Sequence, residues 1–488
     1  MVKISVKWSG KKFDDIEVDL AQPGLVFKTQ LFALTGVAPD RQKILVKGGT
    51  LKDDTDMSSL GLKEGQVLML MGTIGELPKA PTAPVQFVED LTDTQLAKAL
   101  KVPAGLTNLG NTCYMNATLQ CLRAVPELQD SLRGVPAAFS QEPRSNLVKS
   151  MSSLYTQLAN SGDAVTPLVF LQVLRSNFQQ FAEQNNHGFM QQDAEECWGE
   201  IVSALAEKAP GFDLDGGIDA SKKFIDQYFT GETVSTMTCV DAPTEEAKVE
   251  VGTFRQLKAN IGAGVSTYML TDLENNFVET IEKTSETLGR TATYKKVTKI
   301  TRLPAYLTVN FVRFQWKASE RIKAKILKRV KFPFDLDVSS LCDISLLEKL
   351  SPAKLHLKKV EEEKAAAKKA KKNPTPDQGP APMDVDEVAK PNAVTNQAIM
   401  ASLSIDSSLT SDVGANVSGQ YELVAVLTHR GLGANSGHYI GWAKNEKGEW
   451  WKFDDDTVSM MNEEEITKLE GGGDWHTAYI VLYKAKVL

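Results

Sequence analysis

The sequence predicts an α+β protein in which a small and a large domain are joined by a linker. Residues 1–75 alternate polar and apolar residues around one helical pattern, which is typical of a small sheet carrying one helix. The chain from residue 103 to 488 begins with helical patterns and turns to strand patterns from about residue 224. A chain of 488 residues exceeds one compact core, so more than one domain is expected.

The first 75 residues have the element order strand, strand, helix, strand, strand. Alternation predicts strands at 2–6 and 16–20 around a turn at 9–12, and helical spacing predicts a helix over 26–34. Two further strands follow at 44–46 and 67–71.

This order and its loop placement resemble ubiquitin, so a β-grasp fold is expected for the segment. The segment does not end in Gly-Gly but continues as Gly72-Thr73-Ile74, which indicates a built-in ubiquitin-like domain. The outward apolar patch of ubiquitin corresponds here to Leu45, Leu68 and Leu70, which would form a docking surface. The alternative is that some of these leucines belong to the core.

Two further segments differ in composition from the domains. Residues 76–102 contain spaced prolines and are expected to act as an extended linker. Residues 352–418 combine a Lys/Glu/Ala run, a proline-rich stretch and a Ser/Asn/Ala-rich stretch, so we expect a disordered insertion within the large domain.

Composition excludes several classes of protein. The net charge of −7 argues against nucleic acid as a partner. Five scattered cysteines do not form a disulfide framework and fit a reducing compartment, the cytosol or nucleus. The sequence shows neither a signal peptide nor an apolar stretch of transmembrane length, so no membrane association is expected.

Cys113 follows a polar, glycine-containing loop and begins a helical pattern with Met115, Leu119 and Leu122. The free N–H groups and positive dipole end at a helix N-terminus favour a thiolate, which is the nucleophilic form. The same N–H groups can hold an oxyanion, and the Asn108 side chain can add a donor. The alternative is that Cys113 is a small core residue.

A second polar loop enters a helix at residues 185–198. Asp193 is expected to cap that helix, with Glu196 at the third helical position.

The C-terminal part holds a histidine and acidic residues on one predicted hairpin. If Asn445 and Gly448 flank a two-residue turn, His438 lies opposite position 455, and a register change of one residue places it opposite 454. Opposed side chains in such a pair are about 4.5–5.5 Å apart at Cβ, within reach of a carboxylate–imidazole bond. Asp454, Asp455 and Asp456 all lie nearby, and strand geometry alone does not choose among them. With Cys113, these residues suggest a Cys-His-Asp site for nucleophilic catalysis.

Three blocks resemble the Cys, Gln–Asp and His boxes of the ubiquitin-specific proteases. They are residues 105–116, residues 191–194, and residues 436–439 followed by 451–455. The resemblance implies a papain-like domain with a helical thumb, a β palm and fingers, and a thiol-dependent hydrolase acting at the ubiquitin C-terminal glycine.

The family's site residues are carried over onto the matching positions of this sequence. The resemblance implies that Cys113 is the nucleophile, His438 the base and Asp454 the acid that orients it. It also implies that the Asn108 amide binds the oxyanion and that Asp455 is an assisting acid. Ubiquitin-binding positions are Gln192, Asp193, Glu196 and Tyr439, although helix capping explains Asp193 and Glu196 nearly as well.

A ubiquitin-like domain combined with this protease resembles the family's proteasome-associated branch. The resemblance implies that residues 1–75 dock on the regulatory particle of the 26S proteasome and that ubiquitin is trimmed from bound conjugates. It also implies low activity in the free protein, because loops near 316–331 and 430–437 would cover the channel for the ubiquitin tail.

Neither a metal nor another cofactor is expected. Many family members hold zinc through two Cys-x-x-Cys pairs, and a tetrahedral zinc ion needs four ligands. This sequence has no Cys-x-x-Cys pair, and Cys239 and Cys342 each stand without a second cysteine nearby.

Two alternatives remain open at this point. One is a non-catalytic ubiquitin receptor or scaffold, which loss of Cys113, His438 or Asn108 would have marked. The other is a papain-like peptidase that cleaves ordinary peptides.

Overall fold

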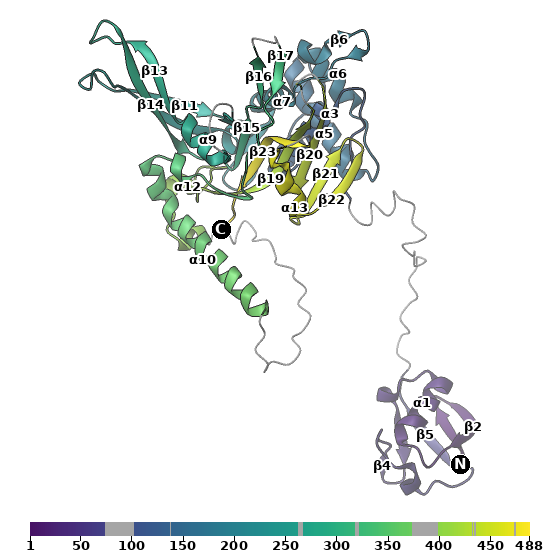
Figure 1. The fold of residues 1–488 in the computed structure, drawn as a ribbon. Coiled ribbons are helices and arrows are strands. Elements are labelled where there is room, and N and C mark those ends of the chain that lie inside the picture. The colour runs from purple at the N-terminus through teal and green to yellow at the C-terminus, as the bar shows by residue number, and fades with distance from the viewer. Residues whose placement is uncertain are drawn as a thin grey trace. The chain divides into compact units, whose positions relative to one another are not determined.

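The structure, a computed structural model, describes residues 1–73, 102–136, 138–261, 267–317, 322–372, 399–431, 433, 436–472 and 475–488. The chain divides into two compact units, both drawn in Figure 1. The linker predicted at 76–102 lies outside the described residues except for residue 102. No described helix is both long and apolar enough to cross a membrane.

The N-terminal unit is a five-stranded sheet with one α-helix, which confirms the expected β-grasp order. Ile4 and Val6 point from the sheet into the core, where Phe27 and Leu31 of the helix cover them. The strand order is β2-β1-β5-β3-β4. The elements are β1 (Val2–Trp8), β2 (Lys11–Val18), α1 (Gly24–Thr35), η1 (Pro39–Arg41), β3 (Lys43–Val46), β4 (Gly49–Thr50), η2 (Met57–Leu60) and β5 (Val67–Met71).

The predicted docking patch is wrong at two of its three positions. Leu45 is 43% exposed, but Leu68 and Leu70 are only 3% and 2% exposed and belong to the core. Successive side chains of a strand point to opposite faces, so β5 exposes Met69 and Met71 instead. Leu45 pairs with Met69 on the outer face. Leu45, Met69 and Met71 are called the outer β patch below.

The first half of the large unit is mostly helical, as its sequence patterns predict. Its helices bury apolar stripes in one shared core, and α3 lies on the sheet strand β20. The α-helices are α3 (Cys113–Leu122), α4 (Pro126–Arg133), α5 (Pro143–Asn160), α6 (Leu168–Asn177), α7 (Ala194–Lys208) and α8 (Phe224–Tyr228). Short elements between them are η4 (Gln179–Ala182), β6 (Gln184–Asn185), β7 (Gly188–Phe189), β8 (Pro210–Phe212) and β9 (Ile218–Lys223).

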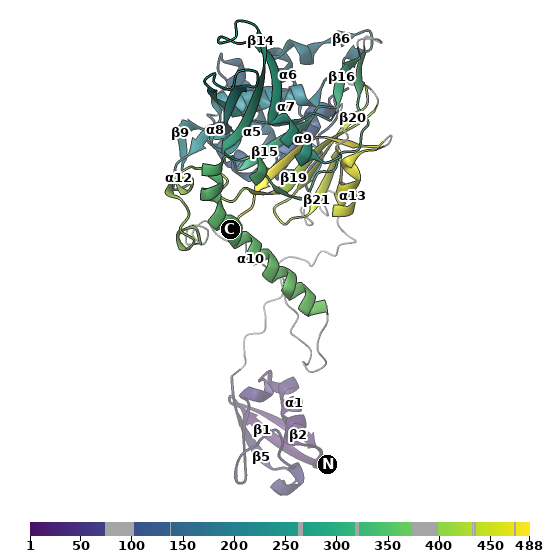
Figure 2. The ribbon, with the colours of Figure 1, turned by 60° about the vertical axis from the view of Figure 1, so that its left-hand side comes forward.

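An eight-stranded sheet forms the second half, and the helices α5–α8 lie toward one side of it in Figure 2. Its order is β12-β15-β23-β19-β20-β21-β22, with β18 paired to β19. The strands are β12 (Leu257–Ala259), β15 (Tyr306–Phe311), β18 (Asp335–Asp337), β19 (Gln420–Arg430), β20 (His438–Lys444), β21 (Trp450–Asp454), β22 (Thr457–Met461) and β23 (Thr477–Ala485).

A separate four-stranded sheet stands away from the eight-stranded one (Figure 1). It has the order β11-β10-β14-β13 and corresponds to the expected finger extension. Its strands are β10 (Gly231–Cys239), β11 (Lys248–Phe254), β13 (Val278–Thr284) and β14 (Thr291–Arg302), with α9 (Met269–Asn276) before β13. A hairpin of β16 (Phe314–Lys317) and β17 (Ile322–Lys325) follows β15.

The disordered insertion predicted for 352–418 is wrong in its described parts. Helix α10 (Ile344–Lys372) runs through the Lys/Glu/Ala segment, and α12 (Ser407–Thr410) lies in the Ser-rich segment. The first part of α10 is packed on the core, because Leu346, Leu350, Ala353 and Leu357 recur at helical spacing and are buried, whereas residues 361–366 of the Lys/Glu/Ala run are exposed. Residues 373–398 lie outside the described residues. The remaining elements are η5 (Ser339–Leu341), α13 (Glu463–Thr467) and η6 (Lys468–Glu470).

Replacing Leu350 by alanine is expected to lower the free energy of unfolding of the large unit by about 2–5 kcal/mol, because it leaves a cavity in the core. Leu350 is 1% exposed, whereas Leu355 of the same helix is 57% exposed. Leu355→Ala is therefore the matched control, with an expected change within about 0.5 kcal/mol. Urea unfolding of both variants checks this, and equal small effects would contradict a packed α10.

Candidate active site

Cys113 is the first residue of α3, at the predicted junction of loop and helix. The N-cap is Thr112, whose carbonyl accepts hydrogen bonds from the N–H groups of Met115 and Asn116, each at 3.1 Å. The Cys113 residue is 3% exposed. Its sulfur therefore lies at the positive end of a helix, in a largely desolvated position.

The sulfur of Cys113 has neighbours from three separate segments. The amide Nε2 of Gln191 and the backbone N–H of Tyr439 each lie 3.5 Å from Sγ. The ring of His438 is the third neighbour, close enough for the thiol to raise the pKa of the imidazole. The loop before α7 and the start of β20 thus meet at the N-terminus of α3.

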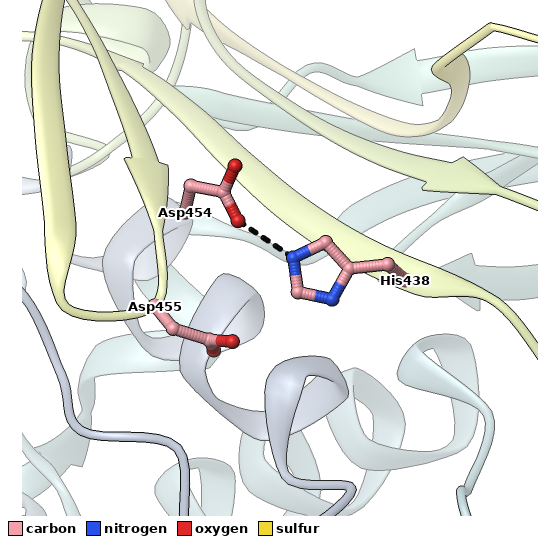
Figure 3. A group of neighbouring side chains, drawn as sticks. All are labelled: His438, Asp454 and Asp455. Atoms are coloured by element: carbon pink, nitrogen blue, oxygen red, sulfur yellow. Dashed lines mark hydrogen bonds and ion pairs between the residues drawn. The ribbon is translucent and has the colours of Figure 1, made fainter.

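His438 and Asp454 form the short hydrogen bond drawn in Figure 3, with 2.6 Å between Nε2 and Oδ1. Asp454 Oδ2 accepts a second bond of 2.8 Å from the ammonium of Lys452. Because Nε2 faces the carboxylate, Nδ1 is the ring nitrogen left for the thiol. Of the three consecutive acids that strand geometry left open, Asp454, which the family resemblance implies, is the one bonded to the histidine.

The predicted hairpin register is wrong by one residue. Gly441 pairs with Phe453, so His438 would lie opposite Asp456 if the ladder continued. The reason is the turn: the N–H of Asn445 donates to Glu449 O, so the loop has three residues, and Gly448 takes the positive φ (+86°) typical of the last residue of such a loop. His438 reaches Asp454 as a diagonal neighbour on the same face.

The acid and base hold each other in their charged forms. The hydrogen bond to Asp454 and, next, that to Cys113 raise the pKa of His438 from 6.5 to about 10. The bond from His438 and then that from Lys452 hold the pKa of Asp454 well below its ordinary value of 3.8, although burial opposes this. The arrangement therefore favours an imidazolium beside the sulfur at neutral pH.

Asp455 does not bond to His438 but connects the turn after β21 to the loop before Cys113. Its two carboxylate oxygens accept from Asn108 Nδ2 and Asn116 Nδ2, each at 2.8 Å. Its carbonyl accepts the N–H of Leu106 at 2.8 Å. The Asn108 amide that sequence comparison assigns to the oxyanion is thus tied to Asp455 in this structure.

Gln191 and Asn116 are two residues of the site to which the sequence patterns gave no role. Gln191 Nε2 donates to Gly437 O at 2.8 Å as well as contacting the sulfur, so it joins the α7 side to the start of β20. Asn116 is 2% exposed and lies one helical turn after Cys113. That i,i+3 spacing and the place of Gln191 beside Gln192 are the sequence signals that could have identified them.

Several predicted ubiquitin contacts are buried or engaged within the protein. The side chains of Tyr439 and Gln192 cannot reach a partner in this conformation, because these residues are only 1% and 8% exposed. The Asp193 side chain caps α7 by accepting the N–H of Glu195 and also accepts the hydroxyl of Tyr479. Glu196 is exposed, so the surface position expected for it is present.

One group among the described residues has the spacing of a metal site, namely His438, Asp454 and Asp455. Lys452 and His438 occupy the Asp454 oxygens, while two amides donate to Asp455. These hydrogen-bond donors point their protons at the carboxylate oxygens of Asp454 and Asp455, so the arrangement does not fit a bound metal cation. Cys239 and Cys342 are the two single cysteines considered above for a zinc site. They lie in different hydrophobic clusters.

Asp454→Ala is expected to reduce stability most between about pH 4 and pH 6.5. Because the pKa of Asp454 is lowered in the fold, its charge stabilises the fold at pH values above 3.8. Because the pKa of His438 is raised, its charge stabilises the fold fully below pH 6.5, and this contribution is lost as the pH rises toward about 10. Thermal unfolding of wild type and variant across pH 4–10 measures the difference. Asp456→Ala, at an exposed neighbour, is the control; a pH-independent difference for Asp454→Ala would contradict the coupled pair.

Comparisons with known proteins identify the family of each domain. The family model described as "Ubiquitin carboxyl-terminal hydrolase" matches residues 104–483, and the model described as "Ubiquitin family" matches residues 2–74. Ubiquitin carboxyl-terminal hydrolase 6 of Arabidopsis thaliana is 42% identical, covering 100% of this chain and 99% of that protein. Its namesake from Schizosaccharomyces pombe is 41% identical with the same coverage. Ubiquitin carboxyl-terminal hydrolase 14 of Caenorhabditis elegans is 36% identical, covering 99% of this chain and 94% of that protein.

A solved structure supports the fold. A chain in the structure of the SAGA Ubp8/Sgf11/Sus1/Sgf73 DUB module bound to ubiquitin aldehyde has a TM-score of 0.51 and 20% identity, covering 79% of this chain and 70% of that chain. The family match spans most of the chain and includes both the cysteine and the histidine segments. The chain belongs to the ubiquitin carboxyl-terminal hydrolase family, with an N-terminal ubiquitin-like domain and a cysteine-type deubiquitinase domain.

Proposed function

We propose that Cys113, His438 and Asp454 hydrolyse the peptide or isopeptide bond after the C-terminal glycine of ubiquitin. The observation that carries this proposal is the meeting of the sulfur, the imidazole and the carboxylate from α3, β20 and β21. Family membership supports ubiquitin as the substrate.

In the first step, the Cys113 thiolate attacks the glycine carbonyl and forms the carbon–sulfur bond. His438, which holds the thiol proton, gives it to the departing amine from Nδ1, and a thioester remains. A water then gives a proton to His438 while its oxygen adds to the thioester carbonyl, and the carbon–sulfur bond breaks. Ubiquitin leaves with a free C-terminal carboxyl group, and the Cys113 thiolate is again paired with protonated His438. Asp454 fixes the tautomer and the plane of the ring throughout.

Oxyanion stabilisation is proposed to come from the N-terminus of α3 and from side-chain amides nearby. The backbone N–H of Cys113 and the Asn108 amide are the donors that the family resemblance implies. Asp455 holds Asn108 through the 2.8 Å bond described above, so it is proposed to assist by fixing the position of that amide.

Loops on the β-sheet side support the proposal that the free protein has low activity. Ala324 of β17 forms an isolated bridge with Gly433 of the 430–437 loop. The ammonium of Lys325 donates to His429 O at 2.7 Å, and Gln191 bonds Gly437 O beside the sulfur. We propose that these contacts must open before a ubiquitin tail reaches Cys113, beside which Gln191 lies.

The ubiquitin-like unit is proposed to dock on the regulatory particle of the 26S proteasome, where the enzyme trims bound conjugates in the cytosol or nucleus. Its outer β patch supports this, because Leu45, Met69 and Met71 are 43%, 51% and 46% exposed on paired strands. Large apolar side chains gathered on one face are typical of a docking surface.

Cleavage of a fluorogenic amide of the ubiquitin C-terminus tests the hydrolase. Cys113→Ala is expected to lower turnover at least about 10⁴-fold, because the nucleophile is lost. The control is Cys239→Ala, which removes a thiol from the small cluster beside the finger sheet. Addition of proteasome is expected to raise wild-type turnover.

The other outcomes of this assay separate the alternatives. Full activity without any response to proteasome would leave the hydrolase and reject regulation by docking. Equal activity on a short peptide amide would favour an ordinary peptidase. A complete lack of wild-type activity in both conditions would favour a scaffold.

Met69→Asp is expected to weaken proteasome binding at least about tenfold while leaving the turnover of the free enzyme unchanged, since it places a charge in an apolar contact. Phe32→Asp is the matched control, because Phe32 is 43% exposed on α1, the helix that covers the inner face of the sheet. Co-sedimentation with purified proteasome measures both. Equal weakening by the two variants would reject the outer β patch as the docking surface.

A further inference from the structure

Lys452 occupies the second oxygen of the acid that orients the histidine. Its Nζ lies 2.8 Å from Asp454 Oδ2, while His438 Nε2 lies 2.6 Å from Oδ1. The three side chains therefore form a line that ends at the Cys113 sulfur. No motif assigned a role to Lys452, which stands between Trp451 and Phe453 in the strand.

The ammonium of Lys452 is itself held in place by neighbouring elements. Lys452 pairs with Trp442 across β20 and β21, and its Nζ lies 5.8 Å from the centre of that indole ring. Trp442 is 3% exposed, and its Nε1 donates to Thr428 Oγ1 at 2.9 Å. The Lys452 side chain is 25% exposed, so it is less free than an ordinary surface lysine.

His476 also lies near Asp454, but it is not a cation at neutral pH. His476 packs against Trp442 and interacts electrostatically with Asp454, His438, Lys452 and Arg430. Burial lowers the pKa of His476 to about 4, so its ring is neutral at pH 7. Lys452 is therefore the cation that hydrogen-bonds Asp454 beside its bond to His438.

We propose that Lys452 is a positioning residue for the deubiquitinase reaction, acting through Asp454. With His438 on one oxygen and Lys452 on the other, the carboxylate cannot turn about its Cβ–Cγ bond without breaking a charge-assisted hydrogen bond. The plane of the carboxylate then fixes the plane of the imidazole and directs Nδ1 at the sulfur. This inference rests on the proposed roles of Cys113, His438 and Asp454.

The role predicts a loss of turnover without a loss of substrate affinity. Lys452→Met is expected to lower kcat about tenfold on the fluorogenic ubiquitin amide, the factor typical of a hydrogen bond to a charged group. The KM is expected to change less than about twofold, since the ammonium is bonded to Asp454 rather than to the sulfur. Lys452→Arg keeps a cationic donor and is expected to recover most of the turnover.

Lys444→Met is the matched control on the same hairpin. Lys444 lies on β20 and forms an ion pair of 3.6 Å with Glu422, away from the His438–Asp454 pair. It is expected to leave kcat and KM unchanged. Thermal unfolding of every variant at pH 7 identifies any that lowers turnover by loss of folded protein.

A double-mutant cycle decides whether Lys452 acts through Asp454. In an Asp454→Ala background, Lys452→Met is expected to cause no further loss, because the group it positions is gone. An undiminished tenfold loss in that background would overturn the proposal. Unchanged kcat in Lys452→Met alone would overturn it as well, while an inactive wild type would instead contradict the proposed function.

Proton NMR of the free enzyme gives a readout independent of turnover. The Nε2 proton shared by His438 and Asp454 is expected to resonate far downfield in wild type, Lys452→Arg and Lys444→Met. In Lys452→Met it is expected to move upfield or broaden, since the carboxylate is no longer held. An unchanged resonance in Lys452→Met would count against positioning even if turnover fell.

Discussion

The close contact between helix α3 and strand β20 is the constraint on which the site depends. An added Cβ at Gly441 would lie 3.1 Å from the carbonyl oxygen of Ala117 and 3.4 Å from the sulfur of Cys121. A side chain at this position would push the helix away by a small amount, so the glycine lets α3 lie this close to the strand. That approach brings Cys113, at the start of α3, to the first residues of β20, where His438 stands.

A second set of contacts fixes the loop before the nucleophile. Asp455 adopts φ +53°, and its side chain and carbonyl hold Asn108, Asn116 and Leu106. A Cβ on Gly105 would meet the carbonyl oxygens of residues 455 and 456 at 2.6–2.7 Å, so the loop also packs closely on this turn. The two consecutive acids thus divide the work: Asp454 holds the histidine, and Asp455 holds the cysteine loop.

Local patterns predicted much of this molecule. The helix that begins at Cys113, the β-grasp order of the first 73 residues and the hairpin with His438 all follow from short-range periodicity and turn residues. Where a prediction required knowing which face of an element is covered, it was less reliable. Leu68 and Leu70 proved to be core, Tyr439 lies inside the protein, and the first part of α10 is held by a sparse apolar stripe that precedes a strongly polar run.

The sequence by itself determined the chemical groups of the site and their order along the chain, because motif spacing and helix starts are local properties. The tertiary structure decided which acid meets His438, since a three-residue turn sets the register between β20 and β21. It also decided that Asn108 bonds Asp455 and that Lys452 bonds Asp454. The first of these bonds joins residues 347 positions apart, which no local pattern encodes. The second joins two residues on one face of β21, but only the register between β20 and β21 places their shared carboxylate against His438.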